Sequence, residues 1–131
     1  MSMSSLENLQ TSYQKGCDML LAEPEIRFAG VINPMGNLIA GGMKEGLTPL
    51  EDEEDKRKMY MELVLRVTTR RDFDYSLGPV KYSASRRRNV VVISFPFENM
   101  VLLISAQPDV EIDKTAKKVM KLWNISNLKV I

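Results

Sequence analysis

Two apolar runs in the second half of the chain constrain the fold more than any other feature. Residues 90–94 read Val-Val-Val-Ile-Ser, and residues 100–106 have a similar apolar character. Strands in which nearly every residue is apolar are buried on both faces, whereas half-buried strands alternate apolar and polar residues. The chain must therefore supply helices that cover both faces of the sheet containing these strands.

Three amphipathic segments can provide that cover. Apolar residues recur mostly three and four positions apart from Leu6 to Leu21, from Leu50 to Arg71 and from Ile112 to Trp123. This spacing places the apolar side chains of each segment on one face of a helix. For the second helix, Thr48 suits the N-cap and Pro49 the first helical position. We predict three helices, each with one apolar stripe.

Three further segments are predicted to be strands. They are Ile26–Ile32, Leu38–Met43 and Val80–Ser85, and a turn at Arg86–Asn89 leads into the strand at residues 90–94, which Pro96 interrupts. Short connections between the strands favour antiparallel pairing. The sequence predicts an α/β (α+β) sandwich with the order α-β-β-α-β-β-β-α. It would form one domain over residues 1–131, with a five-stranded, mainly antiparallel sheet and helices on both faces.

Composition excludes several classes of function. The 18 basic and 17 acidic residues nearly cancel, and so neither nucleic acid nor a membrane surface is an expected partner. The chain has no histidine and one cysteine, Cys17. Catalytic triads, disulfides and cysteine-rich zinc sites are therefore excluded. We predict no enzyme activity and no catalytic, cofactor-binding or metal-binding residues. The absence of a signal-like or long apolar segment predicts a cytoplasmic protein.

Charged residues gather in two places. The run Glu51–Asp55 complements the dipole at a helix N-terminus, although a divalent-metal site is the other interpretation. Arginines follow at the end of the same helix and in the next turn. If the third strand folds back along the second helix, these arginines could share one edge and hold an anion or an acidic partner; otherwise they form a solvated surface. The residues of this predicted patch are Arg66, Arg70, Arg71, Arg86, Arg87 and Arg88.

Glycines and aromatic residues mark two further features. The segment Gly30–Gly46 is rich in glycine but has no phosphate-binding fingerprint, so it indicates turns and bulges or a small pocket where the backbone meets a ligand. Four aromatic residues flank predicted loop ends, where they could be core residues or could line a groove or a dimer seam. They are Phe73, Tyr75, Phe95 and Phe97.

The hairpin from Ala29 to Gly42, with its polar turn and its small residues in the second strand, resembles that of Roadblock/LC7 domains, relatives of the profilin-like and longin-like folds. The whole chain also resembles a small archaeal family of unknown function. The Roadblock resemblance implies a homodimer that pairs the second helix and third strand of two subunits. It also implies a scaffold or regulator of small GTPases or motor complexes, with no catalytic site. The dimer residues so implied are Met59, Leu63, Val67, Val80, Tyr82 and Ala84.

Two functional hypotheses follow. The first is a homodimeric, non-catalytic interaction module that scaffolds or regulates a protein partner, with a small GTPase as one candidate. The alternative is a sensor of the PAS or profilin-like type, in which the glycine-rich hairpin and the arginines together bind a small anionic ligand.

Overall fold

The computed structural model describes residues 3–127 and 131, and for residues 3–7 it describes only the backbone. Its element order confirms the predicted succession of helices and strands, with two short helical pieces added after the second helix. The elements are α1 (Met3–Leu21), β1 (Ile26–Ile32), β2 (Leu38–Met43), α2 (Glu53–Arg70), the 3-10 helix η1 (Arg71–Phe73), α3 (Asp74–Leu77), β3 (Ser83–Arg86), β4 (Val91–Phe97), β5 (Met100–Ala106) and α4 (Ile112–Asn127).

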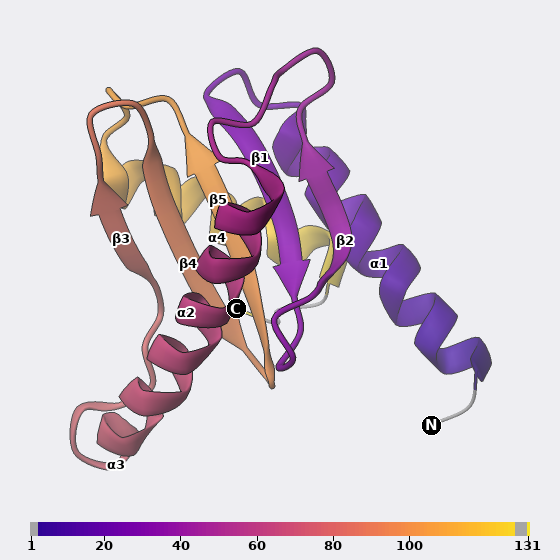
Figure 1. Ribbon diagram of the computed structural model, residues 1–131. Helices are drawn as coiled ribbons and strands as arrows, with labels where there is room; N and C mark the ends of the chain where they lie inside the picture. Colours follow the sequence, from indigo (N-terminus) through magenta and orange to yellow (C-terminus); the bar gives the residue numbers. More distant parts are fainter. Residues whose placement is uncertain (1–2, 128–130) are drawn as a thin grey trace.

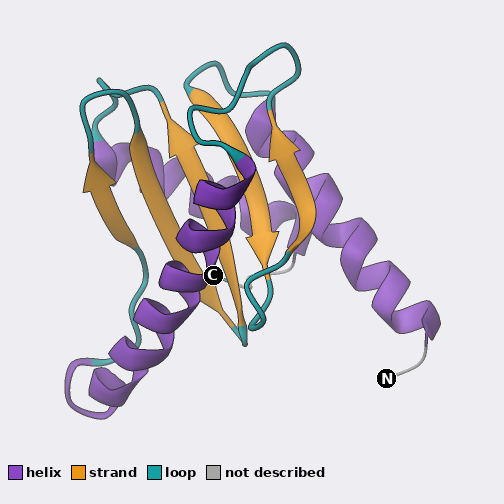
Figure 2. Cartoon of the chain, viewed as in Figure 1, coloured by secondary structure: helices purple, strands orange, loops and turns teal. Residues whose placement is uncertain are grey.

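The five strands form one sheet in the order β2-β1-β5-β4-β3, and every neighbouring pair is antiparallel. The predicted apolar strands β4 and β5 lie inside the sheet, and β2 and β3 form its two edges. Helices cover both faces, as predicted: α1 and α4 lie behind the sheet and α2 lies in front of it (Figures 1 and 2).

The larger part of the core lies between the sheet and the pair α1 and α4. Trp123 of α4 and Phe95 of β4 are its largest fully buried side chains. The two helices approach closely because α1 carries Gly16, where a Cβ atom would come within 2.6 Å of the Trp123 ring. Phe95 and Phe97, two of the four aromatic residues noted in the sequence, belong to this core.

A smaller core lies between α2 and the front of the sheet. Tyr60, Leu63 and Val67 of α2 contact strand residues, among which are Phe28 and Leu103. Figure 1 shows α2 running obliquely in front of the sheet, from the top of the central strands toward the lower end of β3. The helix therefore covers the sheet unevenly and leaves part of β3 and β4 open to solvent.

The second helix begins at Glu53, and the predicted start at Leu50 was wrong. Asp52 is the N-cap, and its Oδ1 accepts a 2.8 Å hydrogen bond from the Asp55 amide. An aspartate caps better than a threonine, and its negative charge is favoured at the positive end of the helix dipole. Asp52 thus caps the helix in place of the predicted Thr48, and residues 47–51 belong to the preceding loop.

The third strand begins at Ser83, and the predicted start at Val80 was wrong. Its register pairs Ser83 with Ser94, so that position 81 would lie opposite Pro96. Proline has no N–H to donate, and the ladder between β3 and β4 cannot continue there. The same geometry allows β4 to run through Pro96 to Phe97, where the sequence predicts an interruption. Arg86, predicted in the turn, is the last residue of β3.

Candidate interaction surface

Helix α1 closes the edge of the sheet at β2. The Gly41 N–H donates a 2.9 Å hydrogen bond to Oε1 of Gln14, and Nε2 of Gln10 donates a 2.9 Å hydrogen bond to the Ile39 carbonyl. The Lys44 N–H donates to the Arg27 carbonyl of β1. Along an antiparallel strand, residues bonded to the neighbour alternate with residues whose main-chain groups point outward, so those of residues 39 and 41 point away from β1. Two glutamines thus occupy main-chain groups that a further strand would need.

Gly41 allows this close arrangement. A Cβ atom at this position would lie 2.0 Å from the Ala29 carbonyl oxygen and 2.9 Å from the Cys17 Sγ, and the residue has a φ of +85°. Only glycine adopts such a backbone without strain. None of the glycines in the segment Gly30–Gly46 lines the open groove beside β3 or the two smaller hollows at the end and on the outer face of α2. At Gly41, the absence of a side chain therefore serves backbone packing.

The opposite edge, at β3, is open. β3 has four residues and pairs with β4 alone. The Arg87 N–H donates to the Val90 carbonyl at 2.9 Å. Hydrogen-bonded pairs occur at every second residue of an antiparallel ladder, so the next such pair is Ser85 with Val92. The N–H groups of Ala84 and Arg86 therefore point away from β4. Among the described side chains, those of residues 8–127 and 131, none forms a hydrogen bond with the main chain of β3. An open edge of this kind is a template for another strand.

An open groove of about 810 Å³ lies beside this edge, between α2 and the uncovered front of β3 and β4. Its floor contains the polar side chains of Ser83, Ser85 and Ser94 together with Val92. Its walls carry both signs of charge, with acidic residues from the start of α2 and basic residues from the β3–β4 turn. The charged lining residues are Arg27, Glu51, Asp55, Lys58, Glu62, Arg66, Arg87 and Arg88.

The residues predicted to form a dimer interface divide between the two faces of the sheet. Leu63 and Val67 are buried against the front of the sheet, and Met59 is 37% exposed. Tyr82 lies on the other side, where it packs near Phe95 and its hydroxyl donates to the Asp113 carboxylate of α4. That hydrogen bond raises the pKa of Tyr82.

Val80 and Ala84 complete that predicted set. Val80 is half-buried in the segment before β3, and the exposed Ala84 belongs to β3 itself. Of the predicted strand residues, Ala84 thus lies on the open edge of the sheet.

The structure does not gather the six predicted arginines into one patch. At the lower end of β3, Arg70 donates to the Ser83 hydroxyl at 2.6 Å and Arg71 to the Glu98 carbonyl at 2.7 Å. Arg66, Arg87 and Arg88 line the groove together, and Arg86 reaches the loop before α4. Figure 1 shows β3 running upward from the lower end of α2, so the turn after β3 lies at the opposite end of the sheet from Arg70 and Arg71.

The arginines of β3 and its turn have different surroundings. Arg86 donates to the carbonyls of Pro108 and Val110 and thereby ties β3 to the loop before α4. Arg87 and Arg88 are exposed and line the groove, as does Arg66, whose Nε lies 3.5 Å from a Glu62 carboxylate oxygen. The glycine strand β2 and the arginine turn occupy opposite edges of the sheet, and the structure does not join them into one pocket.

Several surface residues are conspicuous in the structure but were not singled out by the sequence. Gln10 and Gln14 form hydrogen bonds whose partners are distant in the chain, and no local pattern reveals them. Met61 and Leu65 are 45% and 62% exposed on the outer face of α2. Their presence on the polar side of a helix was the signal that could have found them.

Metal and membrane sites have no support in the described part of the chain. No three carboxylate or cysteine side chains there are close enough to hold a metal ion. None of the helices described is long and apolar enough to cross a bilayer.

The arrangement of the sheet and helices is that of a Roadblock/LC7 domain. The gliding protein MglB of Thermus thermophilus superimposes with a TM-score of 0.71 at 10% identity, over 92% of this chain and 90% of that one. A Roadblock/LC7 domain from Streptomyces avermitilis gives 0.64 at 12% identity, over 88% and 94%. A structure described as MglB with a tetrameric arrangement gives 0.60 at 8% identity, over 88% and 92%.

Sequence comparison places the chain more narrowly. It belongs to a family of unknown function, DUF6659, whose model matches residues 6–126. No curated protein sequence matches it significantly.

Proposed function

We propose that this protein is a non-catalytic interaction module that forms a homodimer through β3 and α2, and that the dimer scaffolds or regulates a protein partner. The observation that carries the proposal is the difference between the sheet edges: α1 occupies main-chain groups of β2, whereas the outward groups of β3 are open. The resemblance to Roadblock domains adds the expectation that the partner is a small GTPase.

Antiparallel pairing of two copies of β3 would give a closed, two-fold assembly. A two-fold axis perpendicular to the sheet relates the strands, so residue i of one copy contacts residue j of the other and the reverse. The two sheets become one, and both copies of α2 lie on the same face. The outward N–H groups of Ala84 and Arg86 then meet carbonyls of the second copy.

The charges along α2 support this orientation. Its first turn contains Glu53, Glu54 and Asp55, and its last turn contains Arg70. The two-fold axis makes the two α2 helices antiparallel, so the basic end of each approaches the acidic start of the other. Complementary charges of this kind favour the correct register and suppress others.

A protein partner can use the outer face of α2. Met61 and Leu65 are exposed there, beside a shallow surface that is also lined by Lys58 and Arg66. In the dimer this surface occurs twice on one face, and a single partner could contact both copies. The tetrameric arrangement described for MglB, a protein of the same fold, supports self-association as a property worth testing here.

The test is the solution mass of an edge variant. Ala84→Pro removes an outward N–H of β3 while leaving the hydrogen bonds between β3 and β4 intact. We expect a dimer for the wild type and a monomer for this variant by light scattering at about 50 µM, a concentration far above the roughly micromolar Kd of a transient homodimer.

Two controls separate the edge from the fold. Ala84→Val changes the same side chain but keeps the N–H, and we expect it to remain a dimer. Gln14→Leu disturbs the β2 edge and should leave the mass unchanged, although one lost hydrogen bond costs about 1 kcal/mol of stability. A monomeric wild type, or an Ala84→Pro variant that is folded and dimeric, would contradict the proposal.

A further inference from the structure

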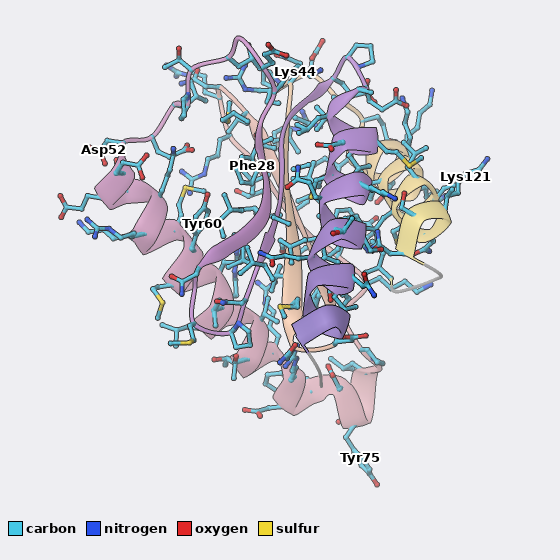
Figure 3. All side chains as sticks on the ribbon, turned by 90° about the vertical axis from the view of Figure 1, so that its right-hand side faces the viewer. Phe28, Lys44, Asp52, Tyr60, Tyr75 and Lys121 are labelled. Carbon is cyan, nitrogen blue, oxygen red and sulfur yellow. The ribbon has the colours of Figure 1, made fainter. Side chains whose placement is uncertain are left out.

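The segment between α2 and β3 exposes three large apolar side chains. Phe73, Tyr75 and Leu77 are 58%, 100% and 82% exposed. Figure 3 shows Tyr75 at the lower end of the molecule, with its side chain directed away from the body of the protein. We refer to residues 72–77 as the α3 tip. Adjacent exposed apolar side chains indicate a contact surface.

Hydrogen bonds tie the chain that leads into the α3 tip to the sheet. Before the tip, Arg70 and Arg71 donate to the Ser83 hydroxyl and the Glu98 carbonyl, both at the lower end of the sheet. The tip itself is closed by a helical hydrogen bond, in which the Gly78 N–H donates to the Asp74 carbonyl at 2.9 Å. A segment anchored in this way presents its side chains in a fixed direction, which lowers the entropic cost of a contact.

Charges on the α3 tip complement those on the β3–β4 turn. Asp72 and Asp74 are on the tip, and Arg87 and Arg88 are in the turn. Within the described residues, none of these four side chains forms an ion pair or a hydrogen bond, although ion pairs occur elsewhere on the surface. In one copy, the tip lies before the start of β3 and the turn after its end, so the two charged groups do not meet.

We propose that in the homodimer the α3 tip of each copy packs against the β3–β4 turn of the other. This inference rests on the proposed dimer. In an antiparallel pair of β3 strands, the start of one strand lies beside the end of the other. The tip precedes the start of β3, and the turn follows its end. The two-fold axis therefore brings each tip next to the other copy's arginines, and the contact forms twice.

The chemistry of the two surfaces matches. Guanidinium groups form hydrogen-bonded pairs with carboxylates, which suits Arg87 and Arg88 opposite Asp72 and Asp74. The fully exposed ring of Tyr75 can stack on a guanidinium plane. This contact gives Arg87 and Arg88 an acidic partner in the form of a second copy of the same chain.

Charge exchange tests this contact in the full-length protein. We expect Asp74→Arg and Arg88→Asp each to raise the dimer Kd about tenfold in sedimentation velocity, because each places like charges together. The double variant Asp74→Arg/Arg88→Asp restores opposite charges and should return the Kd to within about threefold of the wild type. Glu45→Arg, an equal change of charge at an exposed position in the β2–α2 loop, should leave the Kd unchanged.

A chemical cross-link supplies a second measurement. Mixed single variants Ser76→Cys and Asn89→Cys should form a disulfide between copies, whereas Ser76→Cys with Glu45→Cys should not. A wild-type dimer whose Kd is insensitive to both charge reversals overturns the tip contact and leaves the dimer proposal intact. Single variants that weaken the dimer without rescue in the double variant also overturn it. A monomeric wild type contradicts the proposed function itself.

Discussion

Both edges of the sheet have outward main-chain groups with no neighbouring strand, and the two edges differ in what these groups contact. At β2, glutamines of α1 satisfy outward main-chain groups, and Gly41 lets the backbone approach close enough for them to reach. At β3, the four-residue strand ends beside an open, charged groove, and its outward N–H groups face solvent. An edge closed within the chain thus stabilises the fold, whereas the edge left open is the one available for a second molecule.

The largest expected effect concerns the reactivity of Cys17, which lies beneath the closed edge. Burial, and to a lesser degree the negative charge of Asp18, raises the pKa of its thiol to about 12 from an ordinary 9.0. We expect alkylation by iodoacetamide at pH 8 to be about a thousandfold slower in the native protein than in urea, because the thiolate is scarce and inaccessible. Fast native labelling would show that the β2 edge opens.

The same shift has a consequence for stability at high pH. The unfolded thiol ionises near pH 9, whereas the folded thiol stays protonated until about pH 12. The stabilisation is therefore complete below pH 9 and is lost as the pH rises toward 12. Tyr60 acts in the same direction, because burial and then Glu51 and Glu53 raise its pKa to about 12. Denaturation monitored between pH 8 and 12 measures the combined loss.

The second prediction concerns the backbone of the closed edge itself. Gly41→Ala places a Cβ atom 2.0 Å from the Ala29 carbonyl oxygen at a φ of +85°. Strain and displacement together should lower the free energy of unfolding by about 2–4 kcal/mol. Gly46→Ala is the matched control, since Gly46 has a φ of +86° but no atom within 4 Å of the added Cβ. It should cost only about 1 kcal/mol, and equal losses from the two variants in urea titrations would refute the packing role.

The third prediction concerns the open edge. Arg70→Glu reverses a charge at the end of α2 that should approach the acidic start of the second copy's α2. We expect the dimer Kd to rise about tenfold at low salt and less at high salt, because screening weakens the repulsion. Lys121→Glu, on the exposed side of α4 away from this surface (Figure 3), is the control. An unchanged Kd for Arg70→Glu would remove the antiparallel arrangement of α2.

Local patterns in the sequence were enough to predict the order of elements and the two-sided cover of the sheet. The apolar runs of β4 and β5 and the stripes of three helices carry their own periodicity, and they do not depend on distant partners. Two of the predicted boundaries were wrong. The helix cap is Asp52 and not the predicted Thr48, and the ladder of β3 is limited by Pro96, which lies on another strand and could not be read from the β3 sequence itself.

The interaction surface was less predictable because it depends on the direction in which each side chain points in the folded protein. Tyr82 and Ser83 adjoin in sequence, but Tyr82 reaches Asp113 on one side of the sheet and Ser83 accepts from Arg70 on the other. The predicted arginines are divided for a similar reason. Arg70 and Arg71 lie at the start of β3, whereas Arg87 and Arg88 follow its end and share the groove with Arg66. Phe73, Tyr75, Phe95 and Phe97 are all aromatic, and their sequence does not tell them apart. Only the tertiary structure distinguishes the exposed pair, Phe73 and Tyr75, from the buried pair.

Amide hydrogen exchange at residue resolution tests the contrast between the edges most directly. The measurement follows Gly41, Ala84 and Arg86 over a range of protein concentrations that spans dimer formation. We predict that the Gly41 amide, bonded to Gln14, is protected at every concentration, whereas those of Ala84 and Arg86 become protected only as the dimer forms. Rapid exchange at Ala84 and Arg86 in a sample whose mass is that of a dimer would show that the copies pair elsewhere.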